Sequence, residues 1–230
     1  MSRDIYSSLS GATAAQYQMD LIAQNVANAN TNGYKELRAA FELDGNGMGP
    51  LGQVQTRESE TRSDMRSGSI RIDQDPNHLA LQGEGFFVVS ANGREMLTRA
   101  GSFHRNDDGE ILTEAGHQLM GDGGPIDVPV DEQFRVANDG RVFGSKSGEL
   151  GQIRLVNADN VTQVGGGLWR ADSPMMESDA QVVQGALETS NVDPIRAMVE
   201  LVEASRLFEA FQKAMQASDE LDQKLIRMGD

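Results

Sequence analysis

Cysteine is missing from all 230 residues of this sequence. Its absence excludes disulfide bonds, thiolate metal ligands and a cysteine nucleophile, and it is compatible with passage through an oxidising compartment. Long apolar runs are also missing, so we expect no transmembrane segment. Asp4 and Asp20 interrupt the first thirty residues, which lack the apolar stretch of a secretory signal. Any export should therefore occur without signal-peptide cleavage.

Positive charge and aromatic side chains are scarce. The 20 Lys and Arg residues face 35 Asp and Glu residues, which gives a net charge of −15. Such a surface argues against a nucleic-acid partner and against an acidic membrane as a partner. Aromatics make up only 5% of the chain, whereas Gly occurs 25 times, so we expect a body rich in turns. Trp169 is expected to be a core or interface anchor.

Both ends of the chain carry apolar and small residues at alternating steps of four and three, the spacing of a coiled-coil contact face. We predict helices over about residues 4–28 and 194–228, with Asp193 as the cap and Pro194 at the first helical position. Small and polar residues in these faces favour packing among several subunits over a simple two-stranded zipper. The N-terminal face contains Ile5, Leu9, Ala12, Gln16, Met19, Ala23 and Val26. The C-terminal helix has an early stripe of Met198, Leu201, Val202, Ser205 and Phe208. After a slight shift of register, the strict run of four and three comprises Leu207, Phe211, Ala214, Ser218, Leu221, Leu225 and Met228.

The middle of the chain has the period of β-strands. The candidate strands are Ile70–Ile72, Phe86–Val89, Phe134–Val136, Arg141–Phe143 and Ile153–Val156, and hairpin-turn dipeptides are Asn92-Gly93, Asp108-Gly109, Asp122-Gly123 and Asp139-Gly140. The predicted fold class is α+β, with an antiparallel β-rich central domain and the terminal helices paired as a coiled-coil-like layer. The expected segments are an assembly helix and Asn-rich turn (1–35), an extended connector (36–67) with a loop at 44–52, the β-rich body (68–185) and a second assembly helix (186–230).

No arrangement typical of an active or metal site is evident. The stretch 106–110 lacks the ligand spacing of an EF-hand and is expected to be a hairpin turn. The three histidines do not have the spacing of a helical metal pair, no G-x-S-x-G motif is present, and no cofactor is expected. Asp127, Asp131 and Glu132 are interpreted as solvated surface charge. A secreted glycan-acting enzyme that uses Glu110 and Glu114 is an alternative, although nothing in the sequence places the two carboxylates across a cleft.

Four motifs resemble the rod and hook group of bacterial flagellar axial proteins. In chain order they are NANTNGYK (28–35), QGEGFFVV (82–89), LTRAGSFHRNDDGEILTEAGHQLMG (97–121) and ALETSNVDP (186–194). Within this group the start MSRDIYSSLSGA is most similar to proximal rod proteins, and a distal rod or hook-type subunit is the alternative. The resemblance implies a non-enzymatic subunit of the basal body in the periplasm. Its implied partners are copies of itself, other axial proteins and the flagellar type III export apparatus.

The resemblance also makes the Asn-rich turn a candidate assembly site. The residues concerned are Asn25, Asn28, Asn30, Thr31, Gly33 and Tyr34. The Asn and Gly residues favour left-handed backbone, and Gly33 should not tolerate a bulky β-branched residue if its φ angle is positive. From the residues alone, an ordinary helix end followed by a loop is the favoured explanation of this segment, and the resemblance reverses that preference.

Overall fold

The computed structural model describes residues 2–39 and 61–228, and the expected loop at 44–52 lies outside these ranges. The chain divides into two compact units. One, the helical unit, comprises Met1–Ala29, Glu36–Asp64 and Val192–Asp230. The other, the β body, comprises Asn30–Lys35 and Met65–Asn191. The chain therefore enters the β body for only six residues between α1 and β1.

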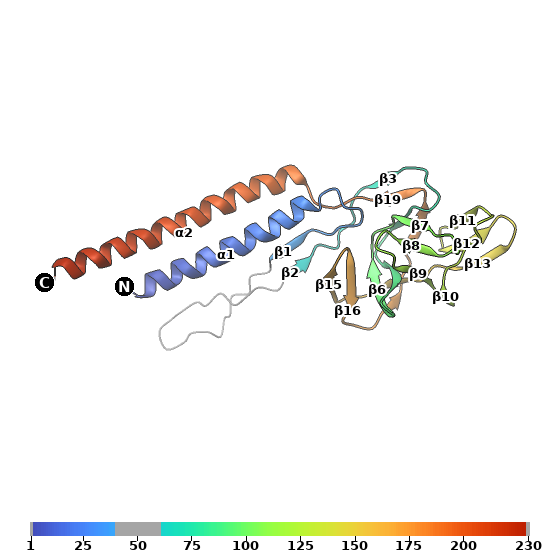
Figure 1. Cartoon of the computed structure of the whole chain (residues 1–230), viewed down its shortest axis with the longest axis horizontal. Coiled ribbons are helices and arrows are strands. Elements are labelled where there is room, and N and C mark those ends of the chain that lie inside the picture. Colours follow the sequence, from blue (N-terminus) through green and yellow to red (C-terminus); the bar gives the residue numbers. More distant parts are fainter. Residues whose placement is uncertain (1, 40–60, 229–230) are drawn as a thin grey trace. The chain divides into compact units, whose positions relative to one another are not determined.

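Two long helices build the helical unit, as the sequence predicts. Helix α1 spans Ser2–Ala27, helix α2 spans Pro194–Met228, and the two pack along each other (Figure 1). The Asp193 carboxylate accepts hydrogen bonds from the backbone N–H groups of Ile195 and Arg196, at 3.0 and 3.2 Å, which confirms the predicted cap. Strands β1 (Leu37–Ala39) and β2 (Thr61–Ser63) pair antiparallel, so the connector predicted to be extended contains a short β-ladder. Neither helix in the described part of the chain is long and apolar enough to cross a membrane.

The buried faces of the helices differ in part from the predicted ones. Along α1 the buried residues include Ala15 and Ile22, whereas Gln16 and Ala23 are exposed. Along α2 the covered face runs at steps of four and three through Ala197, Leu201, Ala204, Phe208, Phe211, Met215 and Ser218. Leu207 and Ala214, which the predicted face included, are exposed. Adjacent positions are both apolar or small here, so periodicity alone could not choose between two registers that differ by one residue.

Short antiparallel strands form the β body. The main sheet of the described residues runs β15-β16-β6-β5-β9-β8-β7, with β10 paired to β9, β14 to β5, and β17 to β14. Its strands are β5 (Phe86–Ala91), β6 (Arg94–Thr98), β7 (Phe103–Arg105), β8 (Ile111–Thr113), β9 (Gln118–Gly121), β10 (Gly124–Pro125), β14 (Leu155–Asn157), β15 (Val161–Gly165), β16 (Leu168–Ala171) and β17 (Met176–Glu177). The smaller sheets are β11 (Phe134–Val136), β12 (Arg141–Gly144) and β13 (Gly148–Gln152), the pair β18 (Gln181–Gln184) and β4 (Leu79–Gln82), and the pair β19 (Ala186–Glu188) and β3 (Ile70–Ile72).

Strand β5 lies at the centre of the body and is buried on both faces. Phe87 and Val89 point into one apolar cluster, while Phe86 and Val88 point into another, as the two-residue period of a strand requires. The second cluster also holds Trp169, whose side chain is fully buried. Burial of each such side chain contributes about 1.5–3 kcal/mol to stability, so β5 contributes strongly to the stability of the body. The prediction that Trp169 anchors a core is confirmed.

Three of the predicted hairpin dipeptides lie between two strands that pair with each other, and in each of them the glycine has a positive φ. Asn92-Gly93 joins β5 to β6, and φ is positive at both residues. Gly109 and Gly140 also have positive φ, between β7 and β8 and between β11 and β12. The turn after β9 differs, because Gly124 rather than Gly123 takes the positive φ.

Two interpretations of the body were wrong. The run 153–156 is not one strand, because Ile153 bridges to Gly121 while β14 begins at Leu155 and pairs with β5. Glu132 is not solvated, because its side chain is buried and accepts hydrogen bonds from Ser147 Oγ and the backbone N–H of Lys146, both at 2.7 Å. Periodicity does not reveal where a short apolar run passes from one strand pairing to another, nor where a turn folds over a carboxylate.

Candidate functional site

The Asn-rich turn is held on the β body by the last residue of β19. After α1 ends, Gly33 takes a φ of +69° and its N–H donates to the Glu188 carbonyl at 2.8 Å. A β-carbon on Gly33 would lie 2.4 Å from the Arg99 carbonyl carbon and 2.5 Å from the Ala100 nitrogen. Glycine is therefore required here for its conformation and for the close approach of two backbones. The left-handed backbone that the sequence favours in this stretch is confirmed at Gly33.

A buried ion cluster lies beneath this turn. Lys35 Nζ is 2.6 Å from Glu188 Oε1 and also donates to the Arg66 carbonyl at 2.9 Å. Arg99 NH1 is 3.1 Å from Glu188 Oε2, and the Gly68 N–H donates to Glu188 Oε1 at 2.9 Å. The three charged side chains are only 1–3% exposed. One carboxylate thus binds two cations and one backbone amide in a dry environment, where each unmade contact would be costly.

The guanidinium of Arg99 connects the cluster to the core. Its NH2 group donates to the Gly83 carbonyl at 2.8 Å, and its Cζ lies 5.6 Å from the centroid of the Phe86 ring. Phe86 in turn packs against Trp169, with ring centroids 5.7 Å apart. The cation is therefore positioned by charge, by a carbonyl and by an aromatic face.

The four sequence motifs meet at this one place. Lys35 and Gly33 belong to NANTNGYK, Gly83 and Phe86 to QGEGFFVV, Arg99 to the third motif and Glu188 to ALETSNVDP. Lys35, Arg99 and Glu188 are not among the candidate residues predicted from the sequence. Lys35 and Glu188 are 153 positions apart in the chain, so no local pattern predicts their contact. The signal that could have found them is that each is a charged residue inside a different motif.

The predicted assembly residues are divided between buried and exposed positions. Those with exposed side chains are Leu9, Asn30, Thr31, Met198 and Leu207. Those that are half-buried are Met19, Val26, Asn28, Leu201, Phe208 and Phe211, and the buried ones are Ala12, Asn25, Gly33 and Tyr34. The side chains of Ile5, Leu221 and Leu225 lie outside the described part of the helices.

Asn25 makes a specific contact within the helical unit. Its Nδ2 donates to the Leu37 carbonyl at 2.8 Å, and its Oδ1 accepts from the Leu37 N–H at 2.9 Å. The amide thus pairs with the β1 backbone as a neighbouring strand would. This contact fixes the start of β1 against the last turns of α1.

A second apolar surface lies on α2, away from its covered face. Ile195, Met198, Val199 and Val202 are 76%, 54%, 55% and 52% exposed. They follow one another at steps of three, one and three, which places them together on the side opposite Ala197 and Ala204. We call these four residues the outer patch of α2.

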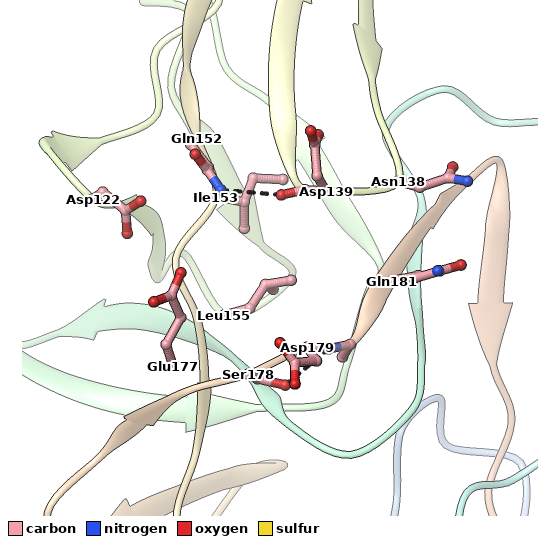
Figure 2. A pocket seen from close by; sticks show the side chains of 11 residues that line it. Asp122, Asn138, Asp139, Gln152, Ile153, Leu155, Glu177, Ser178, Asp179 and Gln181 are labelled. Atoms are coloured by element: carbon pink, nitrogen blue, oxygen red, sulfur yellow. Dashed lines mark hydrogen bonds between the residues drawn. The ribbon is translucent and has the colours of Figure 1, made fainter.

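The β body also contains an open hollow of about 380 Å³. Figure 2 shows its lining, which includes the carboxylates of Asp122, Asp139, Glu177 and Asp179. Among the described residues, no acidic or histidine side chains converge as a metal site. The lining contains neither Glu110 nor Glu114. The Glu110 carboxylate accepts hydrogen bonds from Asn106 in the β7–β8 hairpin and from Gln118 at the start of β9.

Models of known protein families match three segments of the chain. Three family models match it: "Flagella basal body rod protein" at residues 5–35, "Flagellar hook protein FlgE/F/G D1 domain" at 80–144, and "Flagellar basal body rod FlgEFG protein C-terminal" at 183–228. Lys35, Arg99 and Glu188 lie in these three segments, one in each.

Individual relatives match along nearly their whole length. The flagellar basal-body rod protein FlgF of Caulobacter vibrioides is 32% identical over 100% of this chain and 99% of the relative. FlgF of Salmonella typhimurium is 30% identical over 96% of this chain and 95% of its own length. FlgG of Bacillus subtilis is 28% identical over 99% of each. The chain belongs to the family of flagellar basal-body rod proteins.

Proposed function

We propose that the chain is a structural subunit of the proximal rod and that it joins its neighbours through the helical unit. The outer patch of α2 carries this proposal, because four apolar side chains are exposed on a helix whose opposite face is already covered. Contact with another rod subunit would bury them, with a contribution of about 1–2 kcal/mol for each. Contacts of this kind that do not close on themselves generate helical filaments, which suits a rod.

The proximal position is supported by the identities of the relatives. The FlgF relatives are 29–32% identical to this chain, compared with 27–29% for the FlgG relatives. A distal rod or hook-type position is the alternative. Cross-linking in isolated basal bodies distinguishes them, because a distal rod or hook-type subunit should be linked to the hook protein, whereas a proximal subunit should be linked to rod proteins alone.

The export route is part of the same proposal. A rod subunit reaches the periplasm through the flagellar type III apparatus, without loss of an N-terminal segment. Mass spectrometry of the protein in purified basal bodies should then detect peptides from residues 4–16. Their absence from the assembled protein would contradict this route.

A matched pair of variants tests assembly through the outer patch. Met198→Glu/Val202→Glu places two charges on the patch, while Met176→Glu/Val164→Glu changes equally exposed residues of the β body. Both proteins should keep their circular dichroism spectra, since the changed side chains are exposed. We expect only the first variant to be missing from purified basal bodies and to abolish swimming. Normal incorporation of the first variant would refute assembly through this surface.

A further inference from the structure

We infer that Lys35, Glu188 and Arg99 act together as one positioning site, which holds residues 30–35 on the β body. The segments that lead to both terminal helices then leave the body from fixed points. The buried part of the Asn-rich turn, Gly33 to Lys35, serves this internal role rather than contact with a neighbouring subunit. The inference does not depend on how, or whether, the chain polymerises.

The connectivity of the chain gives the first argument. Residues 30–35, 65–68 and 189–191 are the parts of the β body that continue directly into the helical unit. Segment 30–35 is bonded to Glu188 through Gly33 and Lys35, and segment 65–68 is bonded to it through Gly68. The third follows Glu188 in the chain, and Asn191 Nδ2 donates to the Arg66 carbonyl at 3.0 Å. Glu188 is therefore bonded to two of the three segments that leave the body and directly precedes the third.

The chemistry of the cluster gives the second argument. Buried ion pairs stabilise a fold little compared with apolar residues of similar size, because removing the charges from water offsets their attraction. Their partners, however, must lie at defined distances and directions. Here the Arg66 carbonyl accepts a directed bond from Lys35, the Gly68 N–H donates one to Glu188, and the Gly83 carbonyl accepts one from Arg99. A cluster of this kind specifies one arrangement of chain segments more than it adds stability.

Hydrogen exchange in the full-length protein tests the inference. In Lys35→Met the turn keeps the backbone bond from Gly33 to Glu188 but loses the side-chain bonds of Lys35 to the Glu188 carboxylate and the Arg66 carbonyl. Peptides covering residues 30–35 should therefore exchange faster by on the order of 100-fold. The β5–β6 hairpin should stay unlabelled over the same period. The control is Lys146→Met, which removes an exposed ion pair with Asp131 from the same unit. Unchanged exchange of the turn in Lys35→Met, or equal acceleration in the control, would overturn the inference.

A second variant separates positioning from stability. Lys35→Met/Arg99→Met/Glu188→Leu removes all three charges, so that no buried ion is left without a partner. We expect Trp169 fluorescence to report a urea midpoint at or above that of Lys35→Met, while the turn remains fast to exchange. Recovery of wild-type protection at residues 30–35 in the triple variant would overturn the inference, because apolar packing alone would then hold the turn. This measurement also decides the matter if Lys35→Met fails to fold.

Discussion

Replacement of Gly33 by alanine is the sharpest test of the close approach beneath the Asn-rich turn. The chain provides its own control in Gly93, which also follows an asparagine and has a φ of +74° compared with +69° at Gly33. A β-carbon on Gly93 meets no atom within 4 Å, whereas one on Gly33 meets the backbone of Arg99 and Ala100 at 2.4–2.5 Å. The two substitutions therefore share the strain of positive φ and differ in the steric clash.

The expected losses follow from these two contributions. A positive φ costs an L-residue about 1–2 kcal/mol, and this applies to both variants. Overpacking against atoms that cannot move aside costs about 1–3 kcal/mol more, and this applies to Gly33→Ala alone. Gly33→Ala should thus lower the free energy of unfolding by about 2–5 kcal/mol. Gly93→Ala should lower it by about 1–2 kcal/mol.

Urea unfolding followed by the fluorescence of Trp169 measures both losses. This residue is the only tryptophan of the chain, and it is fully buried in the unit that contains both glycines. With a slope of about 2 kcal/mol per molar urea, the two midpoints should differ by about 0.5–1.5 M. Equal midpoints for the two variants would show that the backbones of Gly33 and Arg99 move apart without loss of stability. The close approach at Gly33 would then have no role in holding the turn.

Two further predictions concern other parts of the chain. The Ser147 hydroxyl, followed by the Lys146 N–H, holds the pKa of Glu132 below its usual 4.5, so this carboxylate stabilises the fold above pH 4.5 and ceases to do so as the pH falls through its folded pKa. The urea midpoint of the wild type should therefore fall more steeply on acidification than that of Glu132→Gln, and parallel curves would contradict this. In the helical unit, Asp193→Ala should cost about 1 kcal/mol, seen as a lower melting temperature at 222 nm, while Asp193→Asn retains the cap. Equal melting of these two variants would refute the capping role.

The sequence was sufficient for features that depend on local patterns. Both helices, the Asp193 cap, the fold class and the conformation of Gly33 follow from periodicity and from the preferences of single residues. The register of the helix contact was harder, because Phe208 is preceded by the equally apolar Leu207 and only packing against α1 distinguishes them.

The contacts of the ion cluster were not predicted, since its members are far apart in the chain. Lys35 and Glu188 have charges that usually indicate solvent exposure. Only the folded body shows that Arg99, Arg66 and Gly68 surround them. Glu132 was misjudged for the same reason, because the turn that covers it comes more than ten residues later.

The pairing of β3 with β19 has a mechanical consequence for a protein under load. The two strands are antiparallel, with Ile70 opposite Glu188, so the start of β3 lies beside the end of β19. Both of these ends continue into the helical unit. A force applied to them would separate the two strands by breaking one hydrogen bond after another. Glu188 sits at that end and is bonded to Lys35 and Gly68. The ion cluster therefore holds the two strands together at the end where their separation would begin.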